Sequence, residues 1–201
     1  TPPRRNIETS LRPTALTDIG TAPFIVAVGT LEKRKNYCRL IEAFAAAKQE
    51  IPELQLVIAG SAGDDSSEII QSLELLPKEI VQRIHLIGRV SDENIAWLYQ
   101  HATAMAYPSL DEGFGFPLLE AMSEQLPIVG STRGSIPEVA GPAALLVDPL
   151  DVDALAKAIT KVVTDSDLRQ QLQHAAVDQY NRFSWDKSAQ QLINLYTDLV
   201  K

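Results

Sequence analysis

Two glutamates at the ends of one short segment are the residues of this sequence best suited to chemistry. Glu112 and Glu120 enclose the sequence Glu-Gly-Phe-Gly-Phe-Pro-Leu-Leu-Glu, whose glycines let a ligand approach the backbone closely. Pro117 is typical of the first turn of a helix, where unpaired N–H groups and the positive end of the helix dipole favour a phosphate. Glu120, about one turn further along, is placed to bind a vicinal diol. The segment therefore predicts a cradle for a sugar nucleotide.

The same segment also has a purely structural interpretation. Leu118, Leu119 and Met122 would form the buried face of an ordinary surface helix, with both glutamates in water. Acidic side chains are common near helix starts because they complement the dipole, and glycine-rich loops before helices have many uses. Other segments must decide between the two interpretations.

A basic turn supplies the cations that an anionic ligand requires. Lys33, Arg34 and Lys35 lie in the sequence Gly-Thr-Leu-Glu-Lys-Arg-Lys-Asn, directly before a helical pattern. Two positive charges beside a helix N-terminus suit a diphosphate, so we expect Arg34 and Lys35 to face a ligand. Lys33 is expected to face water, as isolated charges usually do.

Short apolar runs alternate with amphipathic stretches, which indicates a layered α/β fold. The runs are continuous, as in parallel strands buried on both faces. We expect strands at 24–28, 56–59, 84–87, 104–107, 127–129 and 144–147. We expect helices at 36–49, 66–76, 92–101, 117–125, 151–163, 167–180 and 185–200, with N-caps at Asn36, Ser91 and Asp151. The prediction is a doubly wound parallel sheet of the Rossmann-like class.

One domain is expected after a short start. Residues 1–21 have prolines, arginines and little apolar periodicity, and we interpret them as a linker. Residues 22–201 are expected to form the domain, with the fold beginning near Pro23. Ligands bind beyond the carboxyl ends of the strands in such sheets. The loops expected to converge there are 29–36, 60–65, 88–91 and 109–116.

Composition limits the partners and the compartment. The 201 residues are 45% hydrophobic, and their formal net charge of -8 argues against broad binding to nucleic acid or anionic membranes. The single Cys38 cannot form an internal disulfide and is interpreted as a small buried residue of a helix. No apolar run approaches the ~18 residues that a membrane span needs. Since no signal-peptide pattern is present, we expect a cytoplasmic setting.

The residues that a search for metal sites would select are interpreted as structural. Asp151-Val-Asp153 and Asp165-Ser-Asp167 each open a helical pattern, where acidic residues cap N–H groups. No second histidine or cysteine is spaced to complete a metal site with any of the three histidines, His85, His101 and His174. Four aromatic residues at helical positions are expected to be packing residues: Trp97, Tyr99, Trp185 and Tyr196.

Three segments resemble the C-terminal, donor-binding domain of retaining glycosyltransferases of family 4, which have the two-domain GT-B fold. They are the Gly-Thr-Leu-Glu-x-Arg-Lys-Asn turn at 29–36, Pro-Ser-x-x-Glu-Gly-Phe-Gly-x-Pro-x-x-Glu-Ala-Met at 108–122, and Ser-Ile-Pro-Glu-Val-x-Gly-x-Ala-Ala-x-Leu-Val-Asp-Pro at 135–149. Their order and spacing are specific when taken together. The resemblance covers residues 23–200.

The resemblance implies roles for the matching residues. Glu120 would bind the ribose hydroxyls, and Glu112 would hold hydroxyls of the donor sugar together with the backbone N–H groups of Phe114, Gly115 and Phe116. Arg34 and Lys35 would bind the diphosphate. Transfer then passes through an oxocarbenium-like state while negative charge builds on the leaving diphosphate, which fixed cations stabilise. Glu112, Arg34 and Lys35 are therefore the expected catalytic set, and no metal or other cofactor is expected.

A second group of residues would surround the nucleoside. Arg89 and Val90 match the place where the backbone of the family meets the base, although Arg89 could equally be a surface residue. The neighbouring donor-binding positions are Gly29, Gly60 and Ser61. The donor itself is expected to be GDP-mannose or a UDP-sugar.

The resemblance also implies a half that this sequence does not contain. In GT-B enzymes an N-terminal domain binds the acceptor, here a glycan or a lipid-linked sugar, so these residues alone would bind donor and turn over little or nothing. The final helix from Trp185 would cross back toward that domain and leave an apolar face. We expect no nucleic-acid partner and no direct membrane insertion, although the missing domain could hold the protein at a membrane.

Two other functions stay open from the sequence. A noncatalytic module that binds sugar nucleotides or partners would keep the pocket without a catalytic half. Another GT-B activity, such as sugar-nucleotide epimerisation, would release product from the donor without an acceptor. The fold alone does not separate these functions.

Overall fold

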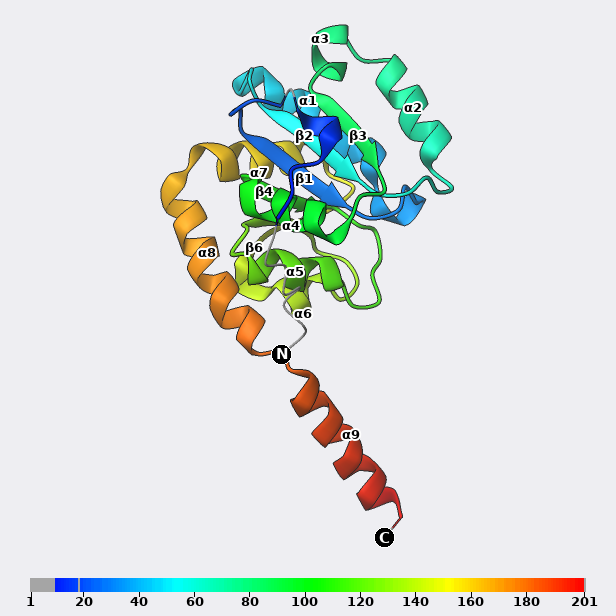
Figure 1. The fold of residues 1–201 in the computed structure, drawn as a ribbon, viewed down its shortest axis with the longest axis vertical. Helices are drawn as coiled ribbons and strands as arrows, with labels where there is room; N and C mark the ends of the chain where they lie inside the picture. Colours follow the sequence, from blue (N-terminus) through cyan, green and yellow to red (C-terminus); the bar gives the residue numbers. More distant parts are fainter. Residues whose placement is uncertain (1–9, 18, 201) are drawn as a thin grey trace.

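A six-stranded parallel sheet forms the centre of the computed structural model, which describes residues 10–17 and 19–200 (Figure 1). The strands are β1 (Phe24–Val28), β2 (Gln55–Ala59), β3 (Ile84–Gly88), β4 (Ala104–Tyr107), β5 (Ile128–Ser131) and β6 (Ala144–Val147). Their order is β3-β2-β1-β4-β5-β6, and all pairs are parallel. The chain therefore runs outward from β1 to one edge and then returns to build the other half. The predicted doubly wound fold is confirmed.

Helices cover both faces of the sheet. The α-helices of the described residues are α1 (Tyr37–Glu50), α2 (Ser66–Glu74), α3 (Lys78–Val81), α4 (Asp92–His101), α5 (Phe116–Ser123), α6 (Ile136–Ala140), α7 (Val152–Thr164), α8 (Ser166–Asn181) and α9 (Trp185–Leu199), of which α9 projects away from the sheet. Alternate strand residues enter two separate cores, because successive side chains of a strand point to opposite faces. Phe24 and Val26 pack with α4, α5 and α8, whereas Ile25 and Ala27 pack with α1 and α7. The short helices α3 and α6 were not predicted.

The three predicted N-cap positions are confirmed, and at two of them the side chain accepts a cap hydrogen bond. Ser91 Oγ accepts from Asn94 N at 3.3 Å, and Asp151 Oδ1 accepts from Ala154 N at 2.8 Å. Asp165 Oδ1 caps α8 in the same way, so the first aspartate of each Asp-x-Asp sequence has a structural partner. Asn36 occupies the N-cap position of α1 as predicted, but its side chain accepts no cap hydrogen bond; its backbone is left-handed, with a φ of 61°, and it follows a 3-10 turn at Lys33–Lys35.

Asn36 instead ties three loops together. Its Nδ2 donates to the carbonyl oxygens of Pro108 at 3.1 Å and Pro149 at 2.8 Å, and the residue is buried. These carbonyls follow β4 and β6, so one left-handed residue after β1 connects loops that lie up to 113 positions away. Cys38, expected to be buried, is only partly buried, with its Sγ 3.8 Å from Asp65 Oδ2.

The segment before β1 packs against the domain. Leu16 and Ile19 are 1% and 3% exposed and belong to the core that contains α4 and α5. These apolar side chains therefore bury surface before Pro23, near which the fold was expected to begin. Residues 1–9 lie outside the described residues, and the boundary at residue 21 stays a prediction.

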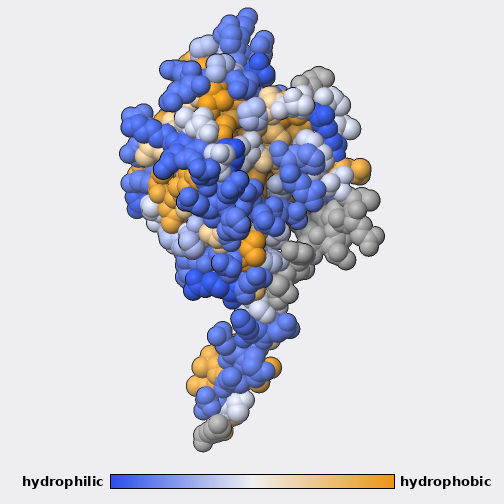
Figure 2. Space-filling view, turned by 90° about the vertical axis from the view of Figure 1, so that its left-hand side faces the viewer, coloured by the Kyte–Doolittle hydropathy of each residue, from blue (hydrophilic) through white to orange (hydrophobic). Residues whose placement is uncertain are grey.

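Helix α9 extends away from the rest of the molecule (Figure 1). Every residue from Trp185 to Val200 is exposed. Tyr196 is 61% exposed, so the expectation that it is a packing residue is wrong. Trp185 is 53% exposed but stacks its ring on Phe116, whereas Tyr99 is buried and Trp97 packs against the core as expected. Apolar residues appear in orange on the projecting helix in Figure 2. No helix in the described part of the chain combines the length and apolar character that a membrane span requires.

The position of Asn36 generates a stability prediction. Replacing Asn36 by Ala should lower the free energy of unfolding by about 2–3 kcal/mol, because two buried hydrogen bonds are lost and a residue with a Cβ stays in the left-handed region. Replacing Asn36 by Gly should recover about 1 kcal/mol of that loss, since glycine has no Cβ. Urea unfolding measures both variants.

Gln125 provides the matched control. It is exposed and has a φ of 56°. Because its backbone is also left-handed, Gln125→Gly should leave stability unchanged or raise it. A Gly variant at position 36 that is less stable than the Ala variant would contradict the assignment of backbone strain to this residue.

Candidate functional site

The candidate site lies where the strand order of the sheet reverses. β1 and β4 are neighbours at the centre, and the chain leaves their carboxyl ends toward opposite edges. The loops that follow them meet directly: Leu110 N donates to Arg34 O at 2.7 Å. In doubly wound sheets the crevice at this point binds ligands. The topology therefore brings two of the predicted segments together.

Glycines allow close backbone contact between the loops that follow β1, β2 and β3. Gly29 N donates to Ala59 O at 3.0 Å, and Gly60 N donates to Gly88 O at 2.9 Å. A Cβ on Gly60 would overlap the carbonyl group of Gly29. Leu31 N also donates to Ser61 O at 2.9 Å. The predicted convergence of the loops after β1, β2 and β3 is confirmed, although no contact assigns them a ligand.

The carboxylate of Glu112 lies between the two cations of the basic turn. Its Oε1 is 2.6 Å from Lys35 Nζ, and its Oε2 is 2.8 Å from Arg34 Nη1. Lys35 Nζ also donates to the Tyr107 hydroxyl at 3.0 Å and lies 4.7 Å from the centre of that ring. The expectation that Arg34, Lys35 and Glu112 share one site is thus met in the geometry.

The two cations differ in their exposure. The side chains of Lys35 and Glu112 are 7% and 8% exposed, whereas that of Arg34 is 46% exposed. Arg34 Nε also donates to Glu32 Oε2 at 2.7 Å. The two cations are thus matched by two carboxylates, those of Glu112 and Glu32. An anion that approaches Arg34 must therefore displace a carboxylate from it.

The charges set the protonation states of the cluster. Burial acts to raise the pKa of Glu112, but the hydrogen bond and the positive charge of Lys35 outweigh burial and leave this pKa below its usual value. Burial and the negative charge of Glu112 raise the pKa of Tyr107 and of Tyr37. Glu112 is therefore ionised at neutral pH, and both phenols are neutral hydrogen-bonding groups.

Residues 112–116, which we call the 112–116 loop, are held from the side by the turn before α6. Ser135 Oγ lies 2.7 Å from Phe114 O and 3.0 Å from Glu112 O. Ser135 N donates to Glu112 O at 3.3 Å. Gly134 precedes it with a φ of 57°. The loop is thus fixed through its backbone as well as through the carboxylate of Glu112.

Helix α5 continues the 112–116 loop as predicted. Gly115 has a φ of 100° and precedes the helix, and Pro117 lies in its first turn. Leu118, Leu119 and Met122 are buried, as both interpretations of this segment required. Glu120 is partly buried, and its Oε2 accepts from the hydroxyl of Tyr99 in α4 at 3.3 Å.

The other residues singled out from the sequence lie outside the cluster of Arg34, Lys35 and Glu112. Arg89 is exposed and Val90 partly buried in the loop between β3 and α4. Lys33 faces water as expected, with its side chain 65% exposed and paired to Glu68 at 3.5 Å. Within residues 10–17 and 19–200, no group of three or more His, Cys, Asp and Glu side chains is arranged to hold a metal ion.

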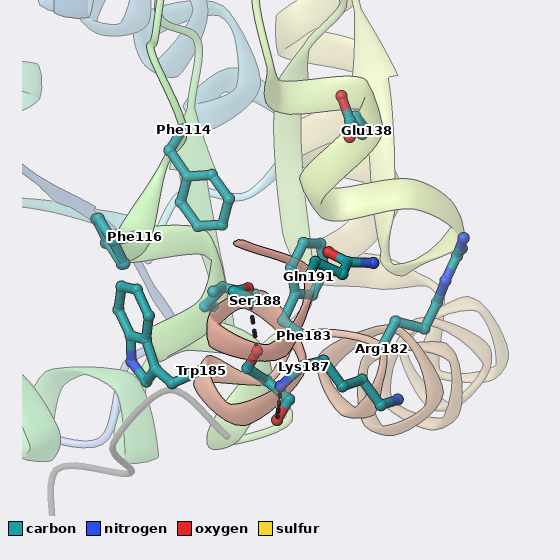
Figure 3. A pocket seen from close by; sticks show the side chains of 11 residues that line it. Phe114, Phe116, Glu138, Arg182, Phe183, Trp185, Lys187, Ser188 and Gln191 are labelled. Carbon is teal, nitrogen blue, oxygen red and sulfur yellow. Dashed lines mark hydrogen bonds between the residues drawn. The ribbon is translucent and has the colours of Figure 1, made fainter. Parts of the chain in front are cut away.

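An aromatic groove lies beside the 112–116 loop. Its volume is about 490 Å³, and Figure 3 shows Phe114 and Phe116 on one side with Phe183 and Trp185 from the α8–α9 junction. The rings of Phe114 and Phe183 meet edge to face at 5.9 Å, and those of Phe116 and Trp185 stack at 6.1 Å. The loop therefore contacts the start of the projecting helix.

Sequence reasoning missed three residues that build the site. Tyr107 was placed only as the end of a strand, although the last residue of a central strand is a position from which side chains reach the crevice. Tyr37, whose hydroxyl donates to Gly29 O at 3.0 Å, had no distinguishing pattern. Ser135 stood within a recognised segment, but nothing local indicated that it contacts a loop more than twenty positions away.

Comparisons with known proteins place the chain among glycosyltransferases. The sequence model described as "Glycosyl transferases group 1" matches residues 15–179. The O-antigen chain mannosyltransferase B of Escherichia coli is 36% identical over 174 residues, which are 86% of this chain and 45% of that protein. The D-inositol 3-phosphate glycosyltransferase of Corynebacterium jeikeium (strain K411) is 33% identical over 179 residues, 86% of this chain and 42% of that protein.

A solved structure gives the same relation in three dimensions. Sucrose-phosphate synthase from Thermosynechococcus elongatus superimposes with a TM-score of 0.74 and 29% identity over 89% of this chain and 46% of that chain. The chain thus spans less than half the length of each of these three relatives.

The unequal exposure of the two cations yields a prediction about stability. Glu112→Ala should lower the free energy of unfolding by about 3 kcal/mol, because it leaves the buried ammonium of Lys35 without its carboxylate. Arg34→Ala should cost less than about 1 kcal/mol, because a largely exposed ion pair contributes little. Urea unfolding at neutral pH compares the two. Equal losses would contradict the assignment of the buried pair as the stabilising one.

The lowered pKa of Glu112 predicts a pH dependence. A carboxyl group whose pKa is lower in the folded state stabilises the protein fully above its unfolded pKa of about 4.3 and loses that effect as the pH falls through the folded pKa. The stability difference between wild type and Glu112→Gln should therefore be constant near neutral pH and shrink below about pH 4. If the stability difference between the two proteins grew as the pH fell, the pKa of Glu112 would be raised by folding and not lowered.

Proposed function

The chain belongs to the family of group 1 glycosyl transferases, and from that premise we propose that it is the donor-binding half of a two-domain, retaining GT-B enzyme of family 4. The proposed reaction moves a sugar from a nucleoside diphosphate to an acceptor hydroxyl. The observation that carries this proposal is the position of Glu112 between Arg34 and Lys35 at the reversal of strand order. Cations, a carboxylate and a helix start at one crevice match the parts of such a donor.

The exposed guanidinium of Arg34 is the proposed diphosphate ligand. An incoming diphosphate carries more charge than the carboxylate of Glu32, and it takes over the donors of Arg34 that now serve Glu32 and Glu112. This exchange releases Glu112 Oε2, which then accepts a hydrogen bond from a hydroxyl of the donor sugar. Lys35 stays on Oε1 and keeps the carboxylate ionised. Diphosphate binding and sugar binding are coupled through one side chain.

The same groups assist bond cleavage. The bond between the anomeric carbon and the diphosphate oxygen breaks, the electron pair stays on the diphosphate, and the sugar passes to the acceptor oxygen, whose proton goes to the leaving diphosphate. Arg34 and the N–H of Phe116, with the positive end of the α5 dipole, stabilise the developing negative charge without reorganisation. We therefore propose that these groups, with Lys35 nearby, serve in place of a metal ion.

The nucleoside is proposed to lie along the glycine-containing loops that follow the carboxyl ends of β1, β2 and β3. Glu120 binds the ribose hydroxyls, while Arg89, Val90 and the loops at Gly29 and Gly60 border the base. Mannose is the proposed sugar because the O-antigen chain mannosyltransferase B is 36% identical to this chain. GDP-mannose is the first candidate donor, and a UDP-sugar is the alternative.

The acceptor is proposed to bind a second half that is not in this sequence. This chain covers 45% of the mannosyltransferase relative, which leaves room in such a protein for another domain of similar size. The exposed apolar face of α9, with Leu192, Ile193 and Tyr196, is the proposed contact with that half. A glycan or a lipid-linked sugar is the proposed acceptor, and these residues alone turn over little donor.

Calorimetric titration with GDP, UDP, GDP-mannose and a UDP-sugar tests the proposal. We expect the chain to bind at least one nucleoside diphosphate, and Arg34→Ala to weaken that binding about tenfold or more, since hydrogen bonds between charged groups contribute about 1.5–3 kcal/mol. Glu120→Ala should weaken the same complex by removing the contact to the ribose.

Lys33→Ala is the matched control, because it removes a cation of the same turn that pairs with Glu68 outside the cluster. Its affinity for the nucleotide should equal that of the wild type. Unchanged affinity in both Arg34→Ala and Glu120→Ala, or no binding of any nucleotide by the wild type, would show that the site has been assigned wrongly.

A further inference from the structure

Ser135 holds two carbonyl groups of the 112–116 loop through its hydroxyl and its backbone N–H. Its Oγ is 2.7 Å from Phe114 O and 3.0 Å from Glu112 O, and its own N–H donates to Glu112 O at 3.3 Å. The two carbonyls belong to residues two positions apart in one loop. Because both contact Ser135, both point to the side of the loop that faces the turn before α6.

The direction of these carbonyls determines the direction of two N–H groups. In a trans peptide the C=O and the following N–H point in opposite directions, and the described residues contain no cis peptide. Because Glu112 O and Phe114 O face Ser135, the N–H groups of Gly113 and Gly115 face away from it. The hydroxyl of Ser135 and its own backbone N–H thus orient both donors.

These N–H groups are available to a ligand. Among the hydrogen bonds found within residues 10–17 and 19–200, none has the backbone N–H of Gly113, Phe114 or Gly115 as donor. A backbone donor that has no protein partner must be satisfied by water or by a ligand. The N–H of Phe116, the first residue of α5, is likewise not a donor in any of these hydrogen bonds, whereas Pro117 has no N–H and Leu118 N donates to Gly115 O at 2.9 Å.

The turn that holds the loop is itself tightly constrained. Gly134 has a φ of 57°, and a Cβ there would lie 2.9 Å from Glu112 N and 3.0 Å from Glu112 O. Meanwhile the carboxylate of Glu112 is held from the other side by Lys35 at 2.6 Å. The 112–116 loop is therefore clamped at its backbone and at its side chain by two different segments.

We propose that Ser135 is a positioning residue for the donor sugar. It acts through the 112–116 backbone and aims the N–H groups of Gly113 and Gly115 at hydroxyls of the sugar, without touching the sugar itself. This inference rests on the proposed function and adds a specific consequence. Ser135 affects the part of the affinity that the sugar contributes, whereas Arg34 affects the part that the diphosphate contributes.

The test compares a sugar nucleotide with the bare nucleoside diphosphate. Calorimetric titration of the chain gives its dissociation constants for GDP-mannose and for GDP, and the ratio of the two measures what the sugar contributes. If the wild type prefers uridine nucleotides, a UDP-sugar and UDP replace them. Ser135→Ala should weaken binding of the sugar nucleotide about tenfold and of the nucleoside diphosphate by less than about twofold. Ser135→Thr keeps the hydroxyl and should restore the sugar-nucleotide affinity.

Ser72→Ala is the matched control, because Ser72 Oγ makes a hydrogen bond of 2.7 Å to the carbonyl of Ile69 in α2. It should leave both affinities unchanged. Equal weakening of both ligands by Ser135→Ala would indicate general loosening of the domain and overturn the inference. Failure of Ser135→Thr to restore binding would also overturn it.

A second measurement tests the inference without a ligand. Amide NMR of the free chain should show that the N–H signals of Gly113 and Gly115 shift and exchange faster with solvent in Ser135→Ala, and return toward wild type in Ser135→Thr. Unchanged signals would overturn the positioning role even if nucleotide binds. If no nucleotide binds the wild type, the proposed function fails, and the role of Ser135 toward a donor fails with it.

Discussion

The buried ion pair between Lys35 and Glu112 is the interaction on which the candidate site depends. A charge with little access to water is costly unless an opposite charge meets it. Lys35 follows β1 and Glu112 follows β4, 77 positions later, so neither charge is satisfied unless both loops occupy their observed places. The sheet topology makes this meeting possible because it sets β1 beside β4. The pair then keeps the crevice polar and fixes the two loops relative to each other.

Around this pair, the site divides into fixed and exchangeable parts. The pair itself, the Tyr107 hydroxyl beneath it and the Asn36 amide that joins three loops are all buried. Arg34 is the partner that water reaches, and it already divides its donors between two carboxylates. Such an arrangement suits a binding site, since the buried groups provide preorganisation while the exposed guanidinium changes partners at little cost.

The sequence predicted what local patterns encode and missed what distant contacts decide. The apolar runs located all six strands, and the segment from Glu112 to Glu120 predicted a glycine loop that leads into a helix. Asn36 was placed correctly at a helix start, but no local pattern indicated that its amide donates to the distant carbonyls of Pro108 and Pro149. Tyr196 was misread as a packing residue because helical periodicity shows an apolar face but not what covers it. Ser135 gave no local signal, since both carbonyls that it contacts belong to another loop.

A crystal structure of the chain with a bound nucleoside diphosphate sugar tests the central claim most directly. The account predicts the diphosphate within hydrogen-bond distance of the Arg34 guanidinium, the carboxylate of Glu32 displaced from it, and the pair of Lys35 and Glu112 intact. A ligand bound in the aromatic groove or at the opposite edge of the sheet, with the contacts of Arg34 unchanged, would contradict the account.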